Sequence, residues 1–145
     1  MLTIQQNRVK EKIITLFTEP ALDLRFPCGL LGFEQIKEYK LHAFPDLHPF
    51  LWLEGQSGNG LCFLAVPPSY VVEFYQIELT GEDVSFLGLT DPDDAVVVNI
   101  ATFHPDGSIT VNLKGPIVYN RHALIGRQVV PKNASTLSIK HPVSN

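Results

Sequence analysis

Short apolar segments bounded by turn residues recur along this chain and constrain its fold more than any other feature. The segments FLWLEG, LCFLAV and VVEFYQIEL are rich in aromatic and β-branched residues and are bounded by Pro, Gly, Asn or Ser. This composition and length are typical of β-strands. The pattern predicts a mostly β fold: a single small antiparallel barrel-like or sandwich-like domain over residues 1–145, with one or two short helices.

Turn residues divide the expected strands into hairpins. A glycine-rich loop at residues 54–60 separates FLWLEG from LCFLAV. Residues 105–107, Pro-Asp-Gly, join AVVVNIATFH to SITVNLKGPIVYN, because proline fixes φ and glycine accepts positive φ. Pro116 has no backbone donor, so we expect the returning strand to end, bulge or lie at an edge there. Two more strands are expected in GRQVVP and TLSIKH.

One short helix is predicted after VVEFYQIEL. Thr80 is suited to cap its N-terminus, and Asp83 stands at the capping-box position. Gly88 is expected to end the helix. The apolar face is formed by Val84, Phe86 and Leu87.

The N-terminal region gives two conflicting patterns. Val9, Ile13, Ile14 and Phe17 fit one face of a helix. By contrast, Leu22, Leu24 and Phe26 alternate as in a strand. We expect a strand or a helical turn that runs into a strand before Pro27.

Charge is distributed unevenly, although the net charge is only −4. No Lys or Arg occurs between Leu41 and Leu113, a stretch with ten acids, whereas the chain from Lys114 onward has bases and no acid. Two outcomes are open: the two segments pair across the sheet, or an acidic surface remains. Such a surface would attract a basic partner and repel nucleic acid.

Catalytic and cofactor signatures are missing from the sequence. Ser57 lies in a GQSGN stretch that departs from the G-x-S-x-G nucleophile pattern, and the five histidines have no metal-site spacing. Cys28 and Cys62 form no CxxC pair, so we expect reduced, partly buried thiols. No signal peptide or membrane span is visible. The sequence therefore favours a binding protein without cofactor, metal, membrane or direct nucleic-acid contact.

Four segments in register carry a resemblance. FPCGLLGFEQIKEYKL, PFLWLEG followed by LCFLAVPP, IELTGEDVSFLGLTDPDDAVVVNIATF, and VNLKGPIVYN followed by GRQVV resemble the flagellar assembly factor FliW family. The similarity runs from Phe26 to about Val130. It implies a bacterial, cytoplasmic, non-enzymatic regulator with a small barrel-like fold.

The resemblance also implies partners. FliW proteins bind the translational repressor CsrA and relieve its repression of flagellin messenger RNA, and flagellin competes as a second partner. We expect a monomer. Two alternatives stay open: a chaperone that binds flagellin only, or a small β-barrel that binds a hydrophobic ligand.

Candidate site residues fall into two groups. The acids expected to face CsrA, since an RNA-binding protein carries basic residues, are Glu73, Glu78, Glu82, Asp83, Asp91, Asp93 and Asp94. The motif residues expected to have structural roles are Phe26, Pro27, Gly29, Leu31, Gly32, Phe33, Asn112, Pro116, Asn120 and Gln128. Within the opening motif, Phe26, Leu31 and Phe33 are predicted to anchor a corner of the fold. The alternative leaves Leu30 and residues 34–39 exposed in an interface.

Overall fold

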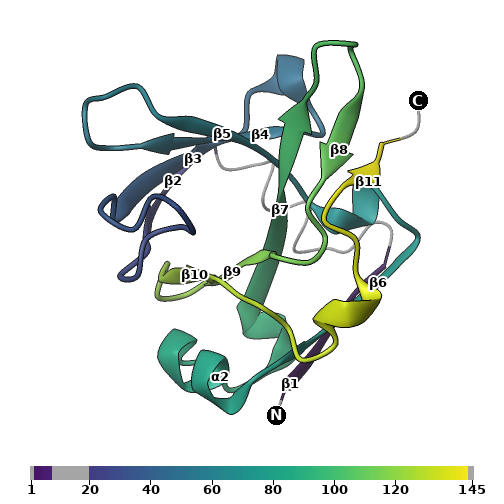
Figure 1. The fold of residues 1–145 in the computed structure, drawn as a ribbon. Helices are drawn as coiled ribbons and strands as arrows, with labels where there is room; N and C mark the ends of the chain where they lie inside the picture. Colours follow the sequence, from purple (N-terminus) through teal and green to yellow (C-terminus); the bar gives the residue numbers. More distant parts are fainter. Residues whose placement is uncertain (1, 8–19, 144–145) are drawn as a thin grey trace.

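Antiparallel strands form the framework of the structure, a computed structural model that describes residues 2–7 and 20–143 (Figure 1). The strands are β1 (Leu2–Asn7), β2 (Ala21–Arg25), β3 (Glu38–His42), β4 (Leu51–Gly55), β5 (Cys62–Val66), β6 (Phe74–Leu79), β7 (Ala95–Phe103), β8 (Ile109–Val111), β9 (Ile117–Asn120), β10 (Gly126–Gln128) and β11 (His141–Pro142). The helical elements are α2 (Gly81–Leu87) and the 3-10 turns η1 (Pro45–Leu47), η2 (Pro68–Tyr70), η3 (Pro92–Asp94) and η4 (Ala134–Thr136). The mostly β, antiparallel fold class is confirmed.

The main sheet curls strongly without closing into a barrel. Its strands follow the order β10-β9-β7-β5-β4-β3-β2, β8 also pairs with β7, and β11 pairs with β8. The two ends meet at a single parallel bridge between Arg25 and Ile125, where the Arg25 N–H donates to the Leu124 carbonyl at 3.0 Å. Strands β1 and β6 form a separate two-stranded sheet. The fold is therefore barrel-like, with a bridge in place of a closing ladder.

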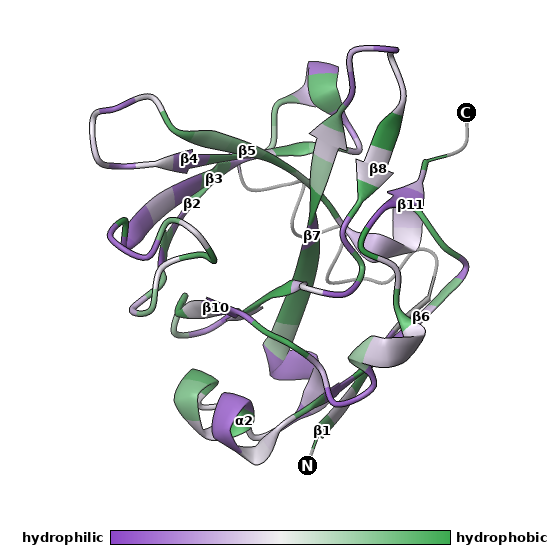
Figure 2. Cartoon of the chain, viewed as in Figure 1, coloured by the Kyte–Doolittle hydropathy of each residue, from purple (hydrophilic) through white to green (hydrophobic). Residues whose placement is uncertain are grey.

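Strand β7 lies between two hydrophobic cores. Its first five residues are all buried, and Figure 2 shows most of the strand in the hydrophobic colour. Successive side chains point to opposite faces of a sheet, so Val97 packs in the core beneath β6 while Val98 packs in the core enclosed by β2 to β5. The neighbouring β9 divides its side chains in the same way. Burial on both faces explains the continuous apolar sequence AVVV.

The predicted helix is confirmed as α2. The Thr80 hydroxyl accepts a hydrogen bond from the Asp83 N–H at 3.1 Å, and Gly88 ends the helix with φ of +66°. The Asp83 carboxylate does not complete a capping box at Thr80, because it pairs with Arg127. The complete capping box of this region lies in η3, between Asp91 and Asp94.

The predicted hairpin at residues 105–107 is confirmed, with Gly107 at φ of +88°. Beyond it the expected single strand is divided into β8 and β9, and both pair with β7. The interruption spans residues 112–116 and so contains Pro116. The expected break at this proline is confirmed.

Two sequence-based expectations are wrong, and one lies outside the described residues. The segment TLSIKH is not a strand before its last residue, His141, which begins β11: η4 ends inside it, Leu137 packs against a core, and Ile139 is 57% exposed. Cys28 is exposed rather than partly buried, whereas Cys62 is half-buried. The possible helix at residues 9–17 is not described, but the strand pattern around Leu24 is confirmed as β2.

Candidate protein-binding surfaces

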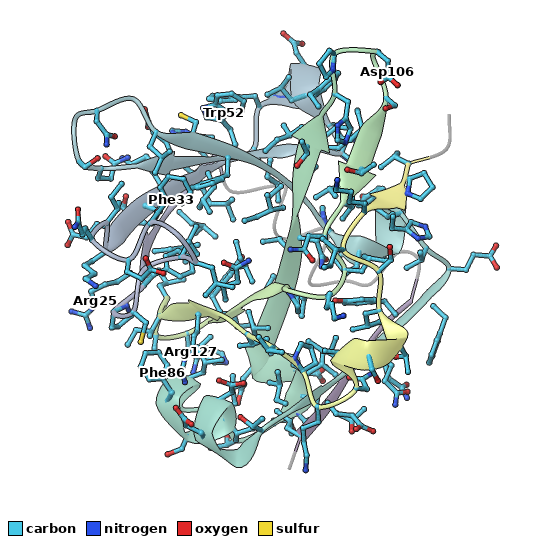
Figure 3. The ribbon with its side chains drawn as sticks, viewed as in Figure 1. Arg25, Phe33, Trp52, Phe86, Asp106 and Arg127 are labelled. Carbon is cyan, nitrogen blue, oxygen red and sulfur yellow. The ribbon has the colours of Figure 1, made fainter. Side chains whose placement is uncertain are left out.

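The predicted acidic residues do not form one continuous face, and Asp83 is the clearest exception. It is buried at 7% exposure, and its Oδ1 lies 3.1 Å from Arg127 Nη1. The same guanidinium contacts Glu82 Oε1 at 3.2 Å and covers the Phe86 ring at 4.5 Å from its centroid (Figure 3). Asp83 therefore holds α2 against β10 and is not available to a partner.

Asp91 and Asp94 are also engaged within the fold. The Asp94 carboxylate accepts hydrogen bonds from the Thr90 hydroxyl at 2.9 Å and from the Asp91 N–H at 3.1 Å, and it pairs with His122 at 3.1 Å. The Asp91 carboxylate accepts from the Asp93 N–H at 2.8 Å. These hydrogen bonds, led by the one from Thr90, lower the pKa of Asp94. Both acids therefore shape the turn that leads into β7.

The remaining acids stay accessible at three places in the chain, at β6, in α2 and in η3. Glu73 is exposed just before β6, and Glu78 is half-buried on that strand. Asp93 is exposed in η3, and the Glu82 side chain is 79% exposed beside Arg127. We define the accessible acids as Glu73, Glu78, Glu82 and Asp93.

The opening motif forms a tight loop between β2 and β3. Phe26 is fully buried, and a Cβ at Gly126 would overlap its ring. The Phe26 ring therefore packs directly against the backbone of β10, next to the end of β2. Gly29 has φ of +67°, and a Cβ there would lie 2.5 Å from Glu34 Cα. The two turns of the loop approach so closely that only glycine fits at Gly29.

Each expectation for the motif holds only in part: Phe26 is buried, and within residues 34–39 Glu34, Gln35, Lys37 and Glu38 are exposed while Tyr39 is buried. Leu30 is buried at 1% exposure, while Leu31 and Phe33 are 61% and 41% exposed. The predicted anchoring role of Leu31 and Phe33 is therefore wrong, and so is the predicted exposure of Leu30. The positive φ of Gly29 and Gly32 on either side turns Leu30 inward and leaves its neighbour outside.

Leu31 and Phe33 form an exposed apolar tip that the rest of the fold holds in place. The Leu31 N–H donates to Gln128 Oε1 at 3.0 Å, and the Gly32 N–H donates to the Glu34 carboxylate at 2.9 Å. The bond from Gly32 is the main cause that lowers the pKa of Glu34. The Phe33 ring packs edge-on against Phe63, with centroids 5.2 Å apart. Beside the tip lies a cleft of about 480 Å³ that reaches the β4–β5 loop.

Of three motif amides, Gln128 and Asn120 join segments that are distant in sequence, and Asn112 shapes a loop. Gln128 also donates to the Gly115 carbonyl at 3.1 Å, which links the apolar tip to the loop around Pro116. Asn112 Oδ1 accepts from the Gly115 N–H at 2.9 Å within that loop. Asn120 donates to the Leu87 carbonyl at 2.9 Å and so fixes the end of α2. These contacts support structural roles for the three amides.

Sequence reasoning also missed Asn133, an amide of the same kind. It donates to the Gln76 carbonyl at 2.9 Å and accepts from the Glu78 N–H at 3.0 Å. Asn133 lies between the expected strands GRQVVP and TLSIKH, and the local sequence gave no signal for a contact with residues more than fifty positions earlier.

The described part of the chain offers no metal site. No group of three or more His, Cys, Asp or Glu side chains in residues 2–7 and 20–143 is arranged to hold an ion. The Ser57 hydroxyl donates to Asn59 Oδ1 at 2.7 Å inside the β4–β5 loop. Over the same residues, the helices are too short or too polar to cross a bilayer.

Comparisons with known proteins agree along almost the whole chain. A model of the FliW protein family matches residues 6–143. The flagellar assembly factor FliW of Natranaerobius thermophilus is 34% identical over 124 residues, which cover 84% of this chain and 82% of that protein. The FliW of Leptospira biflexa is 34% identical over 112 residues, 76% of this chain and 73% of that protein. A crystal structure of the flagellar assembly factor FliW superposes with a TM-score of 0.74 at 26% identity and covers 95% of both chains.

Proposed function

The chain belongs to the FliW family of flagellar assembly factors, and we propose that it acts by binding two protein partners, CsrA and flagellin. In this proposal the protein binds CsrA and relieves its repression of flagellin messenger RNA, while flagellin competes for the protein. It acts in the cytoplasm as a monomer, without enzymatic activity. The family match over residues 6–143 is the observation that carries the proposal.

The accessible acids support an electrostatic contact with CsrA. A protein that binds RNA phosphates carries basic residues, and accessible carboxylates speed the approach of such a protein. Glu73, Glu78 and Asp93 lie in the stretch without Lys or Arg. Asp83 does not belong to this contact, because Arg127 already neutralises it within the fold.

The apolar tip supports a second contact of different character. Leu31 and Phe33 are exposed on a loop fixed by hydrogen bonds, so little conformational entropy is lost when a partner covers them. Flagellin's terminal segments form amphipathic helices, whose apolar faces suit such a tip. We propose the apolar tip as part of the flagellin-binding surface.

Calorimetric titration with the host's CsrA tests the proposal directly. We expect binding that weakens as salt is raised, and that is abolished when flagellin is already bound. A matched pair of variants separates the two surfaces: Leu31→Ser should weaken flagellin binding, whereas Phe103→Ser removes an equally exposed apolar residue, 65% exposed at the end of β7, and should not. Absence of CsrA binding with flagellin binding intact would overturn the partner switch.

That last outcome would favour a chaperone that binds flagellin only. The other alternative, a barrel with a lumen for a hydrophobic ligand, is less consistent with the interior. Phe26, Leu30, Tyr39 and Tyr119 fill the space enclosed by the curled sheet, each at 1% exposure or less.

A further inference from the structure

The two edges of strand β6 have different hydrogen-bond partners. One edge pairs with β1 in an antiparallel ladder from Leu79 to Phe74. Backbone groups of a strand point alternately to its two edges. Because Glu78 donates to Asn133 and accepts from Lys132, the even-numbered residues of β6 face the edge away from β1.

The C-terminal segment covers only the first part of this second edge. The Lys132 N–H donates to the Glu78 carbonyl at 2.8 Å, and the Asn133 carboxamide contacts the Glu78 N–H and the Gln76 carbonyl. The Asn133 carboxamide thus donates and accepts at the places where a peptide group of an added strand would do so. The chain then turns away into η4, seen in Figure 1 as the yellow segment beside β6.

Beyond Asn133, the described residues leave this edge open. Within residues 2–7 and 20–143, no partner faces the N–H of Gln76 or the N–H and carbonyl of Phe74. Next to these groups lies a cleft of about 440 Å³, with apolar walls from Val72, Leu113 and Leu137. The Phe74 side chain is 60% exposed at its rim.

We propose that this edge takes an extended peptide segment of another protein, added as a strand antiparallel to β6 along the direction in which residues 132–133 run. One apolar side chain of the segment enters the cleft. This proposal goes beyond the partner switch, since the backbone groups of β6 define the class of ligand and neither CsrA nor flagellin is assumed.

The backbone groups of β6 that the described residues leave unpaired favour an extended peptide over other ligands. An α-helix has already paired its interior N–H and carbonyl groups, so it cannot bond to those of Gln76 and Phe74. An acyl chain would fill the cleft but would leave the same backbone groups unpaired. Only an extended polypeptide supplies donors and acceptors at ladder spacing together with an apolar side chain.

Amide hydrogen exchange of the free, full-length protein gives the first test. The Glu78 N–H is bonded to Asn133, whereas the Gln76 N–H faces the open edge, so Gln76 should exchange at least about tenfold faster. Equal protection of the two amides would show that the edge is already covered, and would overturn the proposal.

Capped heptapeptides that alternate threonine with leucine, valine or phenylalanine give the second test. At least one should bind with millimolar or better affinity and slow the exchange of the Gln76 amide. The same peptide with alternate N-methyl groups on its β6-facing edge lacks the donors of a strand and should lose binding. Equal binding of the N-methylated peptide, or no binding by any peptide, would overturn strand addition.

A pair of variants locates the site. Leu137→Asn places a polar group in the cleft and should weaken peptide binding at least about fivefold, whereas Ile139→Asn, two residues on and 57% exposed, should not. Thermal unfolding of both variants shows whether Leu137→Asn still folds. The peptides contain no sequence of CsrA or flagellin, so this outcome is independent of the calorimetric test of the partner switch.

Discussion

The backbone N–H of Leu31 donates a hydrogen bond to the side chain of Gln128, 97 residues later in the chain. The two ends of this bond belong to the loop after β2 and to β10, the two margins of the curled sheet. The Arg25–Ile125 bridge lies at the same seam. Gln128 thus fixes Leu31, the most exposed apolar residue of the motif. It does so beside the seam where the two margins of the sheet meet without forming a ladder.

Replacement of Gln128 by Leu should destabilise the protein by about 1–3 kcal/mol, because the Leu31 N–H and the Gly115 carbonyl both lose a partner. Flagellin binding should weaken with it, since the apolar tip loses its support. Urea unfolding and titration measure the two effects. The control is Gln35→Leu, which changes an exposed residue in the loop that also contains Leu31. It should leave the free energy of unfolding within about 0.5 kcal/mol of the parent.

Replacement of Arg127 by Ala should destabilise the protein by about 2–4 kcal/mol, because it leaves the Asp83 carboxylate without its cation in a buried position. The ring of Phe86 also loses its cover. Glu82→Gln removes only the exposed ion pair between Glu82 and Arg127. It should lower the free energy of unfolding by about 0.5 kcal/mol or less. Equal losses for the two variants, measured by denaturant unfolding, would contradict a dominant role for Asp83.

Substitution of Gly29 by Ala should destabilise the fold by at least about 2 kcal/mol, since the new Cβ would meet the Glu34 backbone at a positive φ. Gly32→Ala is a sharp control. Gly32 also has positive φ, but nothing lies within 4 Å of a Cβ there, so about 1 kcal/mol is expected. Similar unfolding midpoints for the two variants would show that the loop relaxes around residue 29.

Reversal of Glu73, Glu78 and Asp93 to Lys should weaken CsrA binding at least about tenfold at low salt and flatten its salt dependence. Asp46→Lys reverses one exposed acid in η1, outside β6 and η3, and is the control for a single charge reversal at another site. Calorimetry at two salt concentrations reads both quantities. An unchanged affinity for the triple variant would remove the accessible acids from the CsrA contact.

Stability should depend on Asp94 at acidic pH. Its hydrogen bonds lower its pKa in the folded state below the unfolded value of about 4. The contribution is therefore complete above the unfolded pKa and is lost as pH falls through the folded pKa. Between about pH 5 and 2, Asp94→Asn should flatten the decline in stability relative to the parent. Chemical denaturation across this range measures the slopes.

Local signals in the sequence predicted the elements whose geometry depends on a few neighbouring residues. The Thr80 cap, the Gly88 stop and the turn at Gly107 all follow from such signals, and each is present. The sequence could not show which leucine of GLLG turns inward, because the backbone angles of Gly29 and Gly32 decide it.

The site was less predictable, for a related reason. Asp83 at a helix start has the same local pattern whether its carboxylate is solvated or paired, and the deciding partner lies 44 residues later. Asn133 likewise bonds to a strand more than fifty residues earlier. Interactions over such separations leave no trace in local composition, so the accessible surface had to come from the folded structure.

The position of β7 between two cores has a practical consequence for binding studies. Neither core can come apart while β7 stays in place, so we expect the described domain to melt in one transition. A ligand that binds only the folded state then raises the melting temperature of the whole domain, wherever it binds. A single thermal scan would therefore report occupancy of the apolar tip and of the β6 edge alike, and only the Leu31 and Leu137 variants would tell the two apart.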